Sequence, residues 1–140
     1  METNLRIHTE KFGIKTTNPL EGHDIGKTLE EILAKSSIVD GVCHIFLPHT
    51  TAAIYMNDCE ENLKEDFEII LQKLVPYHSS YVHNMIDNNA EAHLKSIFIG
   101  NYTAIPVTGA KFDLKEGQTV YLAEFDGPRQ RSVIVKIMGV

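Results

Sequence analysis

The stretch TVYLAEFDGPRQRSVIVKIM (residues 119–138) contains two apolar runs with a short polar break between them. The runs are rich in valine, isoleucine and aromatic residues, which pack well on the pleated surface of a sheet. The break contains Asp126, Gly127 and Pro128, three residue types that favour tight turns. The stretch therefore predicts two strongly apolar strands separated by a turn.

Further strands are predicted on both sides of the middle of the chain. NLRIHTE (residues 4–10) alternates apolar and polar residues, and GVCHIFL (residues 41–47) ends at a proline. YTAIPV (residues 102–107) and KFDL (residues 111–114) precede the opening stretch and are divided from it by glycine-containing turns. Most predicted strands therefore lie towards the end of the chain.

Helical periodicity is found between these strands. One helix is predicted over KTLEEILAKS (residues 27–36), a longer one from about Asp58 to Val75, and a third from Asn89 to Gly100. Their expected inward residues are Leu29, Ile32 and Leu33 in the first helix, Leu63, Phe67, Ile70, Leu71 and Leu74 in the second, and Leu94, Ile97 and Phe98 in the third. Helices in the middle and strands at the end indicate an α+β fold with largely antiparallel sheets and two or three helices. No linker or repeat divides residues 1–140, so we expect a single domain.

Composition excludes some classes of protein. A formal net charge of −6 argues against a nucleic-acid-binding surface, which needs clustered lysine and arginine to displace counterions from phosphates. A small phosphorylated or anionic metabolite needs only one or two local cations and stays open as a ligand. The longest apolar runs are far shorter than the roughly 20 residues that span a bilayer. The polar opening METNLRIHTE is unlike a signal peptide, so we expect a soluble, cytoplasmic protein with no membrane partner.

Three of the seven histidines stand in positions that suit a shared site. His49 follows the proline that ends a predicted strand, His83 lies in the connection YVHNMIDNN, and His93 is one helical turn after Asn89. Three converging imidazoles suit Zn²⁺ or a related divalent ion and leave a coordination position open for water or substrate. The separations match no short metal motif, so the alternative is that each histidine serves a separate local role.

The turn after the first apolar run carries the remaining polar candidates. Arg129 and Arg131 are two residues apart and share a face if the strand begins there. Two guanidinium groups on one face could bind a phosphate or a carboxylate. The alternative is a solvated hairpin whose arginines form surface salt bridges with Glu124 and Asp126.

Several motifs together resemble the YjbQ family, also labelled the secondary thiamine-phosphate synthase family. The motifs are PHTTAAI (residues 48–54), YVHN with DNNAEAHLK (residues 81–95), IPVTGAKFDL (residues 105–114) and YLAEFDGPRQRSVIVKIMG (residues 121–139). Their order and spacing match over nearly the whole chain. The resemblance implies an α+β fold that assembles as a homotrimer, with sites near the subunit boundaries.

The resemblance also implies roles for individual residues. His49, His83 and His93 match the histidines thought to hold a divalent metal, expected here to be zinc. Thr50 and Thr51 match the threonines after the first histidine. The expected catalytic group comprises His49, Thr50, Thr51, Asp58 and Glu124, with the two carboxylates as candidates for proton transfer. The expected substrate-binding group comprises Asn89, Gln118, Asp126, Gly127, Arg129 and Arg131.

Two positions depart from the family pattern. Asn57-Asp58 stands where many members have asparagine and glutamate, which keeps the charge and shortens the reach. KEGQTV (residues 115–120) keeps Gln118 but lacks the tryptophan that many members have, and the chain contains no tryptophan at all. If that ring stacks on a substrate in the family, its loss affects the affinity or the identity of the ligand of this chain; if it only packs a trimer seam, little changes.

The family label implies a metal-dependent enzyme that joins a pyrimidine diphosphate to a thiazole phosphate, with release of pyrophosphate. Diphosphate chemistry usually uses Mg²⁺ with carboxylate ligands, whereas three histidines favour a softer ion. We therefore expect the synthase activity to be weak and secondary. The alternatives are a metal-assisted hydrolase or lyase acting on a small phosphorylated metabolite, a metal- or metabolite-binding module without turnover, and a purely structural trimer.

Overall fold

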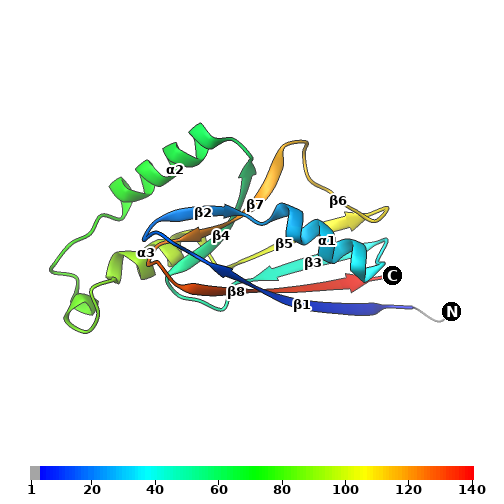
Figure 1. Cartoon of the computed structure of the whole chain (residues 1–140), viewed down its shortest axis with the longest axis horizontal. Coiled ribbons are helices and arrows are strands. Elements are labelled where there is room, and N and C mark those ends of the chain that lie inside the picture. The colour runs from blue at the N-terminus through cyan, green and yellow to red at the C-terminus, as the bar shows by residue number, and fades with distance from the viewer. Residues whose placement is uncertain (1–3) are drawn as a thin grey trace.

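The computed structural model describes residues 4–140 and has two antiparallel sheets with three α-helices (Figure 1). A five-stranded sheet has the order β1-β8-β3-β5-β6, and a three-stranded sheet has the order β2-β7-β4. The strands are β1 (Arg6–Lys15), β2 (Glu21–Asp24), β3 (Gly41–Phe46), β4 (Ala52–Asp58), β5 (Tyr102–Thr108), β6 (Lys111–Phe112), β7 (Gln118–Glu124) and β8 (Gln130–Gly139). The predicted α+β fold with antiparallel sheets is confirmed.

The two apolar strands of residues 119–138 do not pair with each other. β7 is the middle strand of the small sheet, whereas β8 lies between β1 and β3 in the large one. The predicted hairpin is therefore wrong, whereas one of the surface salt bridges predicted with it, between Arg129 and Asp126, is present. Burial explains the difference: β7 is buried on both faces, as the middle strand of a covered sheet must be, whereas β8 alternates buried and partly exposed residues.

The main core lies between the two sheets. β8 contributes Val133, Val135 and Ile137, which are fully buried, and β7 contributes Val120 and Leu122 from the opposite side. Helix α1 (Gly26–Ser36) adds its predicted apolar face to this core. A second, smaller cluster forms on the other face of the small sheet and includes Ala53, Leu71, Ala92, Ala123 and Phe125.

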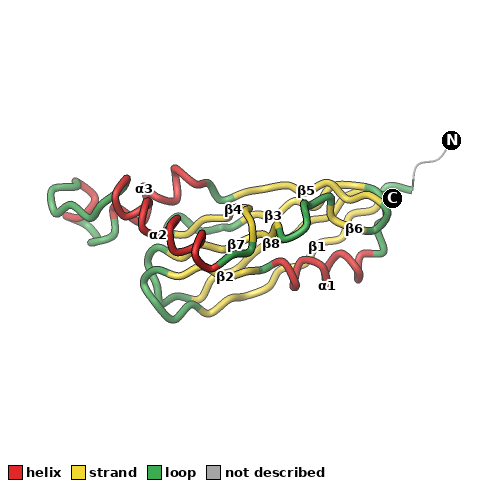
Figure 2. The backbone as a smooth tube through the Cα atoms, turned by 90° about the horizontal axis from the view of Figure 1, so that it is seen from above, coloured by secondary structure: helices red, strands yellow, loops and turns green. Residues whose placement is uncertain are grey.

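The remaining helices cover that other face (Figures 1 and 2). Helix α2 (Glu61–Leu74) begins three residues later than predicted, because Asp58 still belongs to β4 and the side chain of Glu60 caps the helix. A 3₁₀ turn η1 (Val82–Met85) leads to α3 (Ala90–Ile99), which ends at Gly100 as predicted. No helix among residues 4–140 is long and apolar enough to cross a membrane.

Helices α2 and α3 leave much apolar surface uncovered. The prediction that Ile97 and Phe98 turn inward is wrong, since these side chains are 77% and 74% exposed. The side of α3 that packs on the sheet instead carries the small or polar residues Ala90, Ala92, Lys95 and Ser96. In α2 only Leu71 is buried, whereas Ile70 and Leu74 of the predicted stripe are exposed.

Candidate functional site

The loop after β3 and helix α3 bring two of the predicted histidines to one groove. His49 and Thr50 come from the loop, and His93 and Ser96 come from successive turns of the helix. The groove has a volume of about 420 Å³. Ser96 secures α3 against the small sheet, because its hydroxyl donates a hydrogen bond of 2.7 Å to the carbonyl of Ala52.

His93 also lines a second groove, together with His83. This groove has a volume of about 320 Å³ and includes Tyr81 and Leu94. The rings of His83 and His93 meet edge to face, with 4.7 Å between their centroids. His93 is therefore the wall shared by two neighbouring grooves, with His49 in one and His83 in the other.

A hydrogen bond orients the ring of His49, one of the two histidines that flank His93. The Nε2 atom of His49 accepts a bond of 2.9 Å from the backbone N–H of Ser132, so the neutral ring carries its proton on Nδ1. Burial and the charge of Arg131 lower the pKa of His49, against a smaller opposing effect of Glu124. The imidazole of His49 therefore favours its neutral form, in which neither ring nitrogen has a free lone pair as long as Nε2 accepts the bond from Ser132.

A chain of polar groups fixes the ring of His83. The side-chain N–H of Asn89 donates to the Oδ2 atom of Asp126 at 2.8 Å, so the amide oxygen of Asn89 faces His83. The Nε2 atom of His83 donates to that oxygen at 2.9 Å, which leaves the lone pair of Nδ1 free. Arg129 completes the chain with a bond of 2.9 Å to the same oxygen of Asp126. Asn89 is buried and therefore orients His83, whereas Arg129 is about half exposed and can still meet an anion.

Glu124 and Arg131 form a buried ion pair between the two sheets. They share strand faces with the core residues of β7 and β8 and are 1% and 3% exposed. Arg131 donates to both carboxylate oxygens of Glu124 and also to the carbonyl and the hydroxyl of Thr51. The arginine therefore fixes the loop residue that follows His49 and Thr50.

The carboxylate of Glu124 receives further bonds from Thr16 and from the backbone N–H groups of Phe125 and Asp126. Burial acts to raise the pKa of Glu124, but the bonds from Arg131 and Thr16 outweigh it and hold this pKa below its ordinary value. With every oxygen engaged, Glu124 is not placed to shuttle protons, and Arg131 is not placed to bind an external anion.

Gly127 is required by the packing of the turn. A Cβ atom at this position would collide with the carbonyl oxygen of Asn18 and would press on Glu124 and Thr16. We expect Gly127→Ala to lower the free energy of unfolding by about 1–3 kcal/mol, measured by urea denaturation. Gly13→Ala is the matched control, because its Cβ would press only on the flexible end of Gln130 and would meet the carbonyl oxygen of Arg131 at an ordinary contact distance of 3.6 Å. Equal stability of the two variants would contradict the prediction.

Asp58 and Gln118 lie away from the histidines. They pair with each other at one end of β4 and β7, whereas Ala52 pairs with Glu124 at the other end. Six residues of strand at about 3.3 Å each separate the two ends by about 20 Å. Asp58 instead forms an exposed ion pair with Lys115 at 3.2 Å. The predicted residues therefore fall into two groups at opposite ends of the small sheet.

The donor set of one chain falls short of the predicted metal site. Among residues 4–140, no three histidine, cysteine or acidic side chains are arranged to hold a metal ion. His83 and His93 touch each other, while the Nε2 atom of His49 is engaged by Ser132. A single chain thus presents an adjacent pair of histidines with His49 across a groove.

Several residues of this site are absent from the sequence-based prediction. Ser96 could have been found, because it lies three residues after His93 and so shares its side of the helix. Thr16 and the backbone of Ser132 gave no signal, since the first lies in a loop and the second acts through its N–H group.

Comparison with known proteins agrees with this fold over almost the whole chain. The family model "UPF0047 protein YjbQ-like" matches residues 10–140. A UPF0047 protein of Archaeoglobus fulgidus is 40% identical over 125 residues, covering 89% of this chain and 97% of that protein. One of Methanothermobacter thermautotrophicus is 36% identical over 135 residues, covering 96% and 94%.

Solved structures also match the fold over almost the whole chain. A YbjQ-like protein of unknown function from Sulfolobus solfataricus has a TM-score of 0.95 at 36% identity, covering 98% of this chain and 100% of that one. An uncharacterised protein of the YjbQ/UPF0047 family from Clostridium acetobutylicum has a TM-score of 0.87 at 33% identity, covering 91% and 98%. The chain therefore belongs to the YjbQ/UPF0047 family.

Proposed function

We propose that this protein is a metal-dependent enzyme acting on a small phosphorylated or anionic metabolite at the grooves around His93. The observation that carries the proposal is the placement of His93, which contacts His83 on one side and shares a groove with His49 on the other. Fixed imidazoles at the edge of an open groove are typical of catalytic metal sites, where a position is kept for substrate.

His83 and His93 would hold the ion, and His49 would become the third ligand through its Nε2 atom once that atom no longer accepts the hydrogen bond from Ser132. Zinc suits these nitrogen ligands, and when bound it would polarise a substrate oxygen or activate a water molecule. The chain of Asn89 and Asp126 orients His83, as outer partners of metal ligands commonly do. The half-exposed guanidinium of Arg129 would attract the anionic part of the substrate.

The donor set favours a reaction other than thiamine-phosphate synthesis. Departing diphosphate is usually stabilised by Mg²⁺ on carboxylates, but the grooves present imidazoles, and Glu124 is engaged with Arg131. We therefore propose metal-assisted hydrolysis or lyase chemistry as the native activity, with any thiamine-phosphate synthase activity weak and secondary.

The proposal includes a second copy of the chain, which covers the surface beside the grooves. Large apolar side chains are exposed on α2, on α3 and in and just after η1, namely Ile69, Ile70, Leu74, Val82, Met85, Ile86, Ile97 and Phe98. Val82 lines the groove of His83 and Ile97 the groove of His49, and exposed apolar surface at such a place marks an interaction site. Ile97 itself lines the groove of His49, so a subunit covering this surface would close the site. The family resemblance implies three copies.

Metal analysis of untagged protein, purified without chelators, tests the metal site. We expect about one zinc per chain by plasma mass spectrometry, and a loss of most of it in His49→Ala, His83→Ala and His93→Ala. His8→Ala is the matched control, because His8 lies in β1 and bonds Glu10. Wild-type protein without metal, or metal that survives all three substitutions, would overturn the proposal. Metal without turnover of any phosphorylated substrate would indicate a binding module.

A further inference from the structure

The outer face of the large sheet, which points away from the main core, is apolar and largely exposed. Its positions are the odd-numbered residues of β1 and the even-numbered residues of β3, β5 and β8, because the residues between them pack in or against the main core. Apolar side chains stand on all four strands of this face, namely Ile7, Val42, Phe46, Tyr102, Ile134 and Met138. Phe46 pairs with Ile134 on one side and with Tyr102 on the other, so apolar residues of neighbouring strands lie side by side.

The same face is basic. Lys11 and Lys15 of β1 and Lys136 of β8 point outward and are exposed. None of these three lysines forms an ion pair with another residue among 4–140. The outward positions of β1, β3, β5 and β8 contain no aspartate or glutamate, although the whole chain has a formal net charge of −6. The face therefore suits a partner that is both apolar and acidic.

The exposed apolar surface on η1, α2 and α3 has the opposite charge. Helix α2 contains four acidic residues and two lysines, and one of these lysines, Lys64, is already paired with Glu61. Glu65 and Asp66 are exposed, and each lies one helical turn before an exposed isoleucine. Neither forms an ion pair within the described part of the chain. This surface is therefore both apolar and acidic, and it complements the basic face of the sheet.

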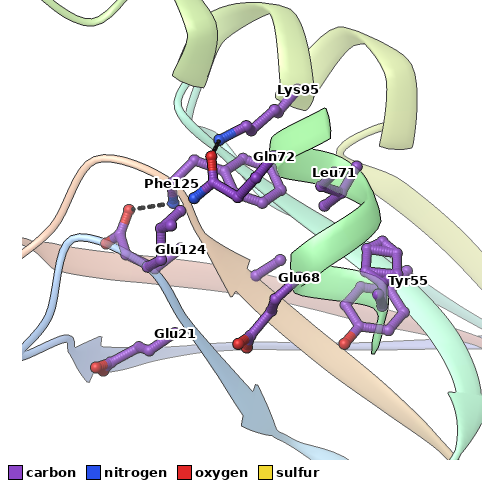
Figure 3. A pocket seen from close by; sticks show the side chains of 11 residues that line it. Glu21, Tyr55, Glu68, Leu71, Gln72, Lys95, Glu124 and Phe125 are labelled. Atoms are coloured by element: carbon purple, nitrogen blue, oxygen red, sulfur yellow. Dashed lines mark hydrogen bonds between the residues drawn. The ribbon is translucent and has the colours of Figure 1, made fainter. Parts of the chain in front are cut away.

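Internal contacts hold this helical surface in place. The Nζ atom of Lys95 on α3 donates a hydrogen bond of 3.0 Å to the Oε1 atom of Gln72 on α2 (Figure 3). Leu71 of α2 is buried in the same small cluster as Phe125 (Figure 3). The inner sides of the two helices are thus occupied, while Phe98 on the outside is 74% exposed. A surface fixed in this way loses little conformational entropy when a partner binds.

We propose that the outer face of the large sheet of one copy binds the surface on η1, α2 and α3 of a second copy. The contact removes apolar side chains of both surfaces from water and brings the lysines of the sheet opposite the acids of α2. The two surfaces differ, so the contact is heterologous, and each copy binds one neighbour through each surface. The inference rests on the proposed covering of the grooves by a second copy, and it adds which face of that copy covers them.

Mixing two variants tests whether these surfaces meet. Phe98→Asp places a charge on the helical surface and leaves the sheet face intact, whereas Phe46→Asp changes only the sheet face, where Phe46 is 40% exposed. Sedimentation equilibrium should give the chain mass for each variant alone and twice the chain mass for an equimolar mixture, because each variant retains the surface that the other lacks. Phe46→Asp with the mass of the wild type, a mixture that stays at the chain mass, or a wild type that sediments as a single chain would overturn the proposal.

Charge reversal tests the same contact without removing an apolar side chain. Lys11→Glu combined with Lys136→Glu should weaken assembly on the order of tenfold. Adding Glu65→Lys and Asp66→Lys to that chain should restore assembly, because opposite charges then face each other again. An assembly that is not weakened by the first pair, or not restored by the second, would contradict the contact.

The matched control is Lys27→Glu combined with Lys35→Glu, two exposed lysines of α1 that lie outside this face. This control should leave the assembly unchanged. Both experiments measure mass alone and depend on neither metal nor turnover. Failure of the proposed enzyme activity would therefore appear in the metal analysis, whereas failure of this contact would appear in the masses.

Discussion

Replacing Glu124 by glutamine is expected to lower the free energy of unfolding by about 3–5 kcal/mol at pH 7. The substitution keeps the shape of the side chain but leaves the guanidinium of Arg131 charged and 3% exposed between the two sheets. An arginine cannot lose its proton in a protein, so this charge stays uncompensated. Arg131 also donates hydrogen bonds to the carbonyl and the hydroxyl of Thr51. Because Glu124 holds Arg131 in place, Thr51 would be held less firmly as well.

Replacing Arg131 instead of Glu124 should lower the free energy of unfolding by less. In Arg131→Met the buried carboxylate of Glu124 can take up a proton, which removes the unpaired charge. We therefore expect Arg131→Met to be less destabilising than Glu124→Gln, and the gap to widen as the pH is lowered from 7 to 5. Urea denaturation of both variants at several pH values measures this. Arg129→Met is the matched control, because its half-exposed pair with Asp126 contributes at most about 1 kcal/mol.

The pH dependence of the wild type follows from the same pair. The pKa of Glu124 lies below its ordinary value of 4.5 in the folded protein, so the folded state favours the ionised carboxylate. Its contribution to stability is complete above about pH 4.5 and is lost as the pH falls through the lower, folded pKa. Acid unfolding of the wild type should therefore be steeper than that of Glu124→Gln. Parallel acid curves, or a loss below 1 kcal/mol in Glu124→Gln at pH 7, would contradict this account.

The sequence contains enough information to predict that Glu124 and Arg131 are buried. Strand alternation places Arg131 on the same face as Val133, Val135 and Ile137, and Glu124 on the same face as Val120 and Leu122. Both charges therefore belong to apolar faces, which indicates a buried pair rather than surface salt bridges. What alternation does not show is that the turn sends β7 and β8 into different sheets. Sheet assignment depends on distant partners, here β4 for one strand and β1 and β3 for the other.

Helix α3 shows another limit of prediction from the sequence. Its ends at Asn89 and Gly100 were predicted from local signals and are confirmed. Its buried side was predicted from the large apolar residues, and this failed for Ile97 and Phe98. Within one chain the helix packs through alanines and Ser96, because small residues let it approach the sheet closely. Hydrophobicity indicates that a side chain avoids water, but not whether its own chain or another covers it.

Phe98→Asp is expected to separate the proposed trimer into single chains of 15.7 kDa. In the isolated chain Phe98 is 74% exposed and touches neither groove, so a charge there should change the stability of one chain by at most about 0.5 kcal/mol. Beneath a neighbouring subunit the same aspartate would be buried without a partner, which is strongly unfavourable. Sedimentation equilibrium should give three times the chain mass for the wild type and the chain mass for the variant.

The control for this experiment is Val39→Asp, an exposed apolar position after α1 that lies outside the surface on η1, α2 and α3. It should keep the mass of the wild type. If a second copy covers this apolar surface, Phe98→Asp should also weaken metal retention, although Phe98 is not a ligand, because the groove beside Ile97 opens to water. Unfolding of the wild type should then depend on protein concentration, and that of the variant should not. A wild type that sediments as a single chain, or a variant that keeps the assembled mass, would show that this surface does not hold the subunits together.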